Sequence, residues 1–167
     1  MTAMRVGFGY DSHVFDEGRP LRLGGVLIPG APGLRGHSDA DALVHALVDA
    51  LYGAAALGDI GSHFPDTDPR WANADSLQFL RAAVAEVRAV GYMVGNVDAT
   101  VICERPKLRP HIDAIRACLA QELGVPVTSV SVKAKTNEGM DAVGEGRGIA
   151  VHCVVLLAFA ESNERVP

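Results

Sequence analysis

Two ionisable residues, Asp11 and His13, stand two positions apart in the apolar and aromatic stretch FGYDSHVF at residues 8–15. On a strand, side chains at i and i+2 point to the same side, so a carboxylate oxygen and an imidazole nitrogen would reach one point. His45 lies in the apolar run DALVHALVDALYGAAAL at residues 41–57. Together the three would supply nitrogen and oxygen ligands and leave a fourth position open, a pattern typical of catalytic zinc sites. An Asp–His hydrogen bond and a satisfied core histidine are the structural alternatives.

The surroundings of His45 indicate how its ring could be oriented. Asp41 and Asp49 are four residues before and after it, so they share its face of a helix. Either carboxylate could bind the second ring nitrogen, as outer carboxylates do for metal-bound histidines.

The motif GHSDAD at residues 36–41 precedes this helix. Ser38 or Asp39 could cap the helix through a side-chain oxygen. We expect His37 near the helix N-terminus, where the dipole and free N–H groups favour an anion such as a phosphate. Capping alone would explain Ser38 and Asp39, but it does not explain His37.

Three aspartates fall in the irregular motif DIGSHFPDTD at residues 59–68. Their carboxylates suit sugar hydroxyls, and the backbone around Gly61 would allow a ligand to approach closely. An aspartate-rich turn without a ligand is the alternative.

Two further motifs carry groups for anions and cations. In KAKTNEG (133–139), Glu138 could bind a hard cation such as Mg²⁺. Phosphate contacts in the same motif would come from Lys133, Lys135 and Thr136. ERPKLRP (104–110) offers a second anion site through Arg105, Lys107 and Arg109. A solvated edge strand is the alternative for the lysines.

The composition excludes several classes of protein. The net charge of −5 argues against a general nucleic-acid binder. No apolar run reaches the roughly 18 residues of a membrane span, and the start MTAMRVGFG lacks the apolar region of a signal peptide. The three cysteines have long spacings, which fits free thiols in a reducing compartment. We therefore expect a cytoplasmic protein that binds neither nucleic acid nor membrane.

The expected elements form an α/β fold, an α+β sandwich with helices on one face of a mixed β-sheet. We expect a single domain over residues 1–160 and a polar C-terminal tail at 161–167. Strands are expected at 4–15, 21–28, 93–103, 129–136 and 149–159. Helices are expected from Asp39 or Asp41 to Leu57, at 76–90 and at 107–124, and loops at 29–40 and 58–74.

Over residues 4–159 the chain closely resembles the family of 2-C-methyl-D-erythritol 2,4-cyclodiphosphate synthases of the non-mevalonate isoprenoid pathway. The resemblance rests on GYDSHVF, LGGVLIP, HSDADALVHALVDALYGAAALGDIGSHFPDTD, GYMVGNVDATVI, PKLRPHI and VSVKAKTNEG. It implies a homotrimer of α/β subunits with active sites between neighbours. By the same i, i+2 geometry, Tyr10 should point away from the metal.

The resemblance also assigns roles to residues. Zinc ligands would be Asp11, His13 and His45, and Glu138 would hold a second metal, Mg²⁺ or Mn²⁺. The groups that position phosphates and stabilise the transition state would be His37 and Thr136. Substrate contacts would come from Asp11, His13, Ser38, Asp59, Ile60, Gly61, Phe64, Pro65, Asp66, Thr67, Asp68, Cys103, Pro106, Lys107, Leu108, Arg109, Lys135, Asn137 and Glu138.

The reaction that the resemblance implies is an intramolecular phosphoryl transfer. The 2-phosphate of 4-diphosphocytidyl-2-C-methyl-D-erythritol 2-phosphate attacks the β-phosphorus, CMP leaves, and a cyclic diphosphate forms. Such chemistry depends on positioning and charge neutralisation, and it needs no nucleophilic side chain. The chain departs from the family at Lys135, where Thr or Ser is common. It also departs at a late turn, where Glu145 precedes Arg147; in the family, this region lines a cavity on the trimer axis.

Two other functions remain open at this point. The first is a catalytically inactive trimeric binding protein of the same fold. The second is a zinc hydrolase that activates water at the open metal position, although no H-E-x-x-H motif occurs.

Overall fold

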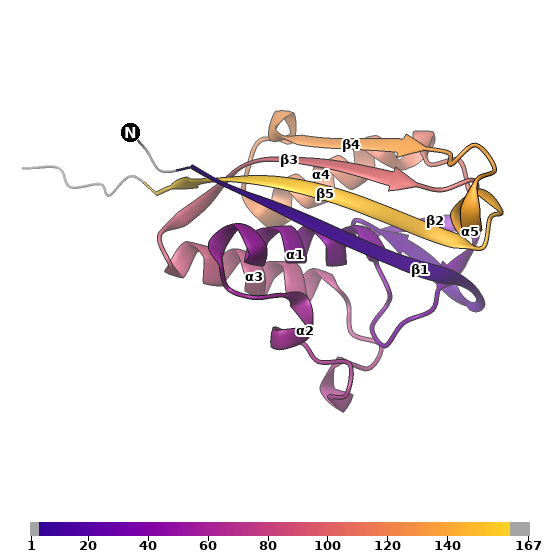
Figure 1. The fold of residues 1–167 in the computed structure, drawn as a ribbon, viewed down its shortest axis with the longest axis horizontal. Coiled ribbons are helices and arrows are strands. Elements are labelled where there is room, and N and C mark those ends of the chain that lie inside the picture. The colour runs from indigo at the N-terminus through magenta and orange to yellow at the C-terminus, as the bar shows by residue number, and fades with distance from the viewer. Residues whose placement is uncertain (1–3, 161–167) are drawn as a thin grey trace, which may run out of the picture.

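The structure, a computed structural model, describes residues 4–160, which contain one mixed five-stranded sheet and helices packed against it (Figure 1). The strands are β1 (Met4–Leu23), β2 (Val26–Leu34), β3 (Tyr92–Ile102), β4 (Val130–Lys135) and β5 (Gly148–Phe159). The helices are α1 (Ala42–Ala55), α2 (Ile60–His63), α3 (Leu77–Ala89), α4 (Ile112–Leu123) and α5 (Asp141–Gly144). Short 3-10 turns are η1 (Pro69–Trp71), η2 (Arg109–His111) and η3 (Val127–Ser129).

The strand order is β2-β1-β5-β3-β4. Strand β1 runs antiparallel to β2 and β5, β5 runs antiparallel to β3, and β3 and β4 are parallel. Helix α1 packs on β1 and β5, and α3 packs on α1, so the helices cover one face of the sheet (Figure 1). The predicted mixed sheet with helices on one face is confirmed.

Two glycines of β1 allow α1 to lie directly against the strand. A Cβ atom on Gly7 would come within 1.9 Å of the Ala50 carbonyl oxygen, and one on Gly9 within 1.9 Å of that of Ala46. Any larger side chain at either position would therefore push strand and helix apart. Because Gly7 and Gly9 alternate in phase with Asp11, the same face of β1 presents Asp11 to the helix.

The opposite face of β1 is apolar and exposed. Its large side chains Met4, Val6, Phe8, Tyr10 and Val14 are all between 48% and 68% exposed. Tyr10 lies on this face, with its ring 5.1 Å from that of His152 on β5. The prediction that Tyr10 points away from Asp11 and His13 is thus confirmed.

Helix α1 begins at Ala42, two residues later than a cap at Asp39 would place it. Its N-cap is Asp41, whose Oδ1 accepts from the Val44 N–H at 3.0 Å, and neither Ser38 nor Asp39 caps the helix. Asp41 is fully buried, and its two oxygens also accept from both N–H groups of the turn Gly24–Gly25, at 2.9 and 2.7 Å. One carboxylate therefore both starts α1 and holds the β1–β2 turn.

Several expected boundaries differ from the structure. Strand β1 continues to Leu23, and β2 extends to Leu34 through the expected loop at 29–40, because the two form a hairpin around the Gly24–Gly25 turn. The expected loop at 58–74 contains α2 and η1.

Near the C-terminus the differences have local causes. Helix α4 begins at Ile112 rather than at 107, because the stretch around Pro110 forms the 3-10 turn η2. Helix α5 was not predicted. The predicted tail at 161–167 lies outside the described residues. Within residues 4–160, no helix has the length and apolar character needed to cross a bilayer.

Candidate active site

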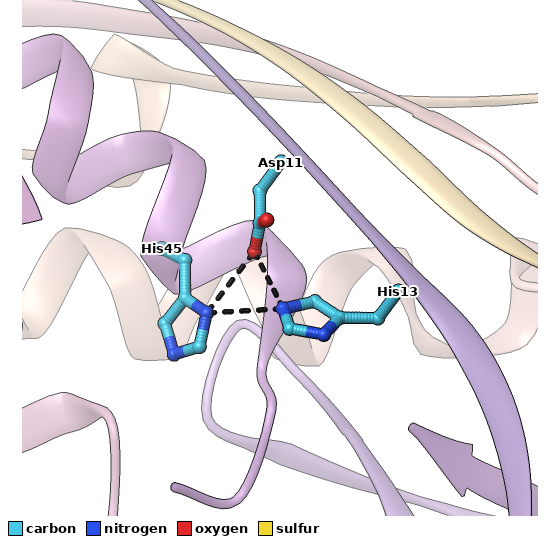
Figure 2. Close-up of side chains that lie close together, drawn as sticks. All are labelled: Asp11, His13 and His45. Carbon is cyan, nitrogen blue, oxygen red and sulfur yellow. Dashed lines mark hydrogen bonds and ion pairs between the residues drawn. The ribbon is translucent and has the colours of Figure 1, made fainter. Parts of the chain in front are cut away.

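Three side chains from β1 and α1 converge on one point (Figure 2). Asp11 Oδ2 lies 2.9 Å from His13 Nε2 and 3.0 Å from His45 Nδ1, and the two nitrogens are 3.4 Å apart. Tetrahedral ligands at about 2.0–2.1 Å from a zinc ion stand about 3.3–3.4 Å apart. The three donor atoms therefore have nearly the spacing that such an ion requires.

The outer ring nitrogens determine which atoms face this point. His13 Nδ1 lies 2.7 Å from the carbonyl oxygen of Arg35 and donates to it. His45 Nε2 lies 2.9 Å from the hydroxyl of Ser76 and 3.2 Å from that of Ser38. With the outer nitrogens protonated, the inner nitrogens present lone pairs beside a carboxylate. Such a donor set fits a cation better than the isolated Asp–His hydrogen bond that the sequence left open.

Neither aspartate expected to orient His45 does so. Asp41 caps α1, and Asp49 accepts from the Ile60 N–H at 2.8 Å. The hydroxyl of Ser76 takes this role, and it donates in turn to the carboxylate of Asp39. Ser76 is fully buried at the start of α3, far from His45 in the sequence.

Charge at this point favours the binding of a cation. Burial opposes ionisation of Asp11, but its close contacts with His13 and His45 outweigh burial and hold the pKa of Asp11 well below its usual range. Burial likewise opposes the charged form of His13, yet the bond to Asp11 raises the pKa of His13. Asp11 is therefore an anion at neutral pH.

A cavity of about 450 Å³ opens beside the three side chains. Residues expected at the site that line it are His13, His37, Ser38, His45, Ile60, Gly61, Phe64, Pro65 and Asp66. Three further lining residues, Gly36, Trp71 and Phe79, were not predicted. The ring of Phe64 stacks on Phe79 at 4.5 Å and meets Trp71 edge-on at 5.3 Å. The aromatic content of the 58–74 segment was the available sequence indication for Phe64 and Trp71, whereas Phe79 lies in the predicted helix at 76–90.

His37 lies in the cavity wall, but it does not lie at the N-terminus of a helix as expected. Helix α1 begins after Asp41, and His37 Nε2 donates to the carbonyl oxygen of Asp68 at 2.9 Å. The guanidinium of Arg19 donates to the backbone carbonyl oxygens of the two residues that flank His37. These are the carbonyl of Gly36, at 2.6 Å, and the carbonyl of Ser38.

Three predicted residues of the 59–68 motif do not line this cavity: Asp59, Thr67 and Asp68. Asp59 caps α2, accepting from the N–H and hydroxyl of Ser62 at 2.8 and 2.6 Å. Asp68 pairs with Arg70 at 2.6 Å, and this pair lowers the pKa of Asp68. The two aspartates thus form part of the local turn structure, as the alternative interpretation of this motif predicted.

The remaining predicted residues form a second group away from this cavity. They lie at or just after the carboxyl ends of the parallel strands β3 and β4: Cys103, Pro106, Lys107, Leu108, Arg109, Lys135, Thr136, Asn137 and Glu138. The Cys103 N–H donates to the Lys135 carbonyl at 2.8 Å, which joins the two loops. Leu108 is only 3% exposed, so its side chain belongs to the core. A separate cavity of about 710 Å³ is lined in part by Pro106 and Lys107.

Glu138 lies in this second group, with its carboxylate accepting from the Thr136 hydroxyl at 2.6 Å. Among the described residues, the only cluster of three or more metal-ligating side chains is that of Asp11, His13 and His45. Within one chain, the predicted zinc ligands and the predicted diphosphate contacts therefore lie in separate places.

Comparison with known proteins adds a family to this geometry. Residues 4–158 match the YgbB family. The chain is 60% identical over 154 residues to the 2-C-methyl-D-erythritol 2,4-cyclodiphosphate synthase of Cupriavidus metallidurans, which covers 92% of both proteins. The bifunctional IspDF from Campylobacter jejuni superposes with a TM-score of 0.92 at 40% identity, over 95% of this chain and 43% of that one.

A solved 2C-methyl-D-erythritol-2,4-cyclodiphosphate synthase in its CDP-bound form superposes with a TM-score of 0.85 at 44% identity. This match covers 92% of this chain and 99% of that chain. The chain therefore belongs to the YgbB family, as a relative of the 2-C-methyl-D-erythritol 2,4-cyclodiphosphate synthases.

Proposed function

We propose that the chain converts 4-diphosphocytidyl-2-C-methyl-D-erythritol 2-phosphate into 2-C-methyl-D-erythritol 2,4-cyclodiphosphate and CMP, as a metal-dependent phosphorus–oxygen lyase. The observation that carries this proposal is the convergence of Asp11, His13 and His45 beside a cavity of about 450 Å³. The relatives support it, because they are named as the synthase and match nearly the whole chain.

The proposed step forms one P–O bond and breaks another. An oxygen of the 2-phosphate attacks the β-phosphorus, and the bond to the oxygen that leaves with CMP breaks. Asp11, His13 and His45 would hold zinc, and Glu138 would hold Mg²⁺ or Mn²⁺. The metals would neutralise phosphate charge as the two anionic groups approach.

The chain's own residues would position the substrate. The aromatic wall of Phe64, Trp71 and Phe79 would pack against the methylerythritol carbons and exclude water. His37 and Ser38 bring polar groups to the same cavity, next to the zinc ligands. Their backbone is held by Arg19, so these groups would not have to be ordered when substrate binds.

We further propose that the active site is completed by a neighbouring subunit in a homotrimer. Two observations support a shared site: the diphosphate contacts stand apart from the zinc ligands, and β1 exposes an apolar face that a neighbour could cover. The three unpaired thiols fit a reducing compartment, and we place the reaction in the cytoplasm.

The inactive alternative draws no support from relatives that are named as synthases. The hydrolase alternative would need a Glu or His general base near the metal, and no H-E-x-x-H motif occurs. Among the described residues, the cluster holds only one carboxylate, that of Asp11, and both neighbouring histidines bind it.

The direct test measures CMP released from the cytidyl substrate by purified protein supplied with zinc and Mg²⁺. We expect turnover in the wild type, one zinc per subunit by elemental analysis, and loss of both in His45→Ala. His111→Ala, which removes an imidazole outside the cluster, should keep the zinc. A wild-type protein that binds zinc but releases no CMP would contradict the proposed function. Sedimentation of an active monomer would contradict the shared site.

A further inference from the structure

His63 belongs to the segment that walls the candidate active site, but its ring points elsewhere. It is the last residue of α2, and its neighbours Ile60, Gly61, Phe64 and Pro65 line the cavity, whereas His63 does not. The imidazole instead stacks on the ring of Tyr52 in α1, with centroids 3.9 Å apart and an interplanar angle of 8°. Tyr52 is fully buried, so His63 packs on a fixed surface.

Both ring nitrogens of His63 have partners on different elements. Nε2 lies 2.9 Å from the carbonyl oxygen of Leu57, just after α1. Nδ1 lies 3.1 Å from Oε2 of Glu86 on α3, and the Tyr52 hydroxyl donates to the other oxygen of Glu86 at 3.4 Å. Because a carbonyl and a carboxylate only accept, the ring nitrogen is the donor in each contact. A contact with a carboxylate belongs to the charge-assisted, stronger class of hydrogen bond.

The proposed reaction does not use this group of side chains. His63 is 24% exposed and Glu86 is 42% exposed, and neither lines the cavity. A single turn such as α2 is not stable by itself, so its place depends on such contacts. Other contacts also hold α2, including the cap from Asp59 and the bond from the Ile60 N–H to Asp49. Losing His63 should therefore loosen the wall without unfolding the chain.

We propose that His63 is a positioning residue, which holds the cavity wall of residues 60–66 against α1 and α3 for the substrate. The inference rests on the proposed function for its substrate, but its structural basis is independent. Phe64 follows His63 directly and stacks on Phe79 at 4.5 Å, so a displaced α2 would move the apolar wall. The expected consequence is weaker binding of substrate and an unchanged chemical step.

The test compares His63→Gln, His63→Ala and Glu86→Gln with the wild type. His63→Gln and Glu86→Gln each weaken one hydrogen bond, so KM should rise by about threefold. His63→Ala removes all of these contacts, so KM should rise by about tenfold. In all three variants kcat should be unchanged. Amide hydrogen exchange at residues 60–64 should accelerate in the same order. Glu122→Gln is the matched control, because Glu122 pairs with Arg81 of α3 at 2.7 Å and does not line the cavity.

Three results would overturn the proposal. The first is that the His63 and Glu86 variants have the same KM, and the same amide exchange rates at residues 60–64, as Glu122→Gln. The second is a fall in kcat at constant KM, and the third is faster exchange throughout α1, which would show general destabilisation. If the wild type releases no CMP, the proposed function fails, and the exchange at residues 60–64 still decides whether His63 holds the wall.

Discussion

The contact between β1 and α1 gives the sharpest prediction about the metal site. A Cβ atom on Gly9 would lie 1.9 Å from the Ala46 carbonyl oxygen, whereas ordinary contact begins at 3.4 Å. In Gly9→Ala, strand and helix must therefore separate by about 1.5 Å. Asp11 and His13 lie two and four residues further along β1, and His45 precedes Ala46 on α1. The substitution would therefore move the two ligands on the strand away from the ligand on the helix.

The size of the effect follows from the tolerance of metal sites. Metal–ligand distances vary by only about 0.2 Å, so a separation of about 1.5 Å would remove His45 from the ligand set. We expect zinc affinity to fall by at least about tenfold, which is the lower end of the losses caused by displaced supporting groups. Overpacking should also reduce the free energy of unfolding by about 1–3 kcal/mol.

Zinc affinity is measured by competition with a chromophoric chelator, and stability by denaturant titration of the same samples. Gly53→Ala is the matched control on the same helix, because a Cβ atom there meets nothing closer than Phe8 O at 4.0 Å. It should stabilise α1 by about 0.5–1 kcal/mol and leave zinc affinity unchanged. Wild-type zinc affinity in Gly9→Ala would refute the argument that this close approach assembles the site.

Two further predictions concern buried polar groups and thiols. Asp41→Ala removes the cap of α1 and leaves the buried N–H groups of Gly24 and Gly25 without partners. The free energy of unfolding, measured by denaturant titration, should therefore fall by about 3 kcal/mol or more. Burial raises the pKa of Cys153 to about 12, so its reactive thiolate is scarce at pH 8 and increases as the pH rises. Alkylation of the native protein, followed by mass spectrometry, should therefore label the half-buried Cys118 first, and Cys153 only after unfolding; early labelling of Cys153 would contradict this.

The parts of the site that could be predicted are those governed by local geometry. The i, i+2 rule placed Asp11 and His13 on one face of a strand, and the structure has both on the face of β1 that meets α1. The apolar run at 41–57 predicted a buried helix, and α1 spans Ala42–Ala55. Both patterns depend only on residues near each other in the sequence.

The parts that could not be predicted depend on contacts between distant residues. Ser76 orients His45 from the start of α3, and nothing in the spacing around either residue indicates that they meet. The nearby aspartates were better candidates by spacing, but the N–H groups of Gly24, Gly25 and Ile60 bind them instead. An unsatisfied buried N–H costs as much as a lost hydrogen bond, so the backbone takes these carboxylates first.

The arrangement of the two groups of site residues supports the proposal that the reaction needs more than one chain. The zinc ligands come from a strand and a helix that touch along glycines, and hydrogen bonds from the two histidines to Arg35, Ser38 and Ser76 of the same chain hold their rings. The predicted diphosphate contacts follow β3 and β4, and none of them lines the cavity beside those ligands. An in-line attack requires reacting atoms about 3–3.5 Å apart. A second chain that brings its β3–β4 loops to this cavity would satisfy that requirement, so zinc binding should survive dissociation of the subunits and CMP release should not.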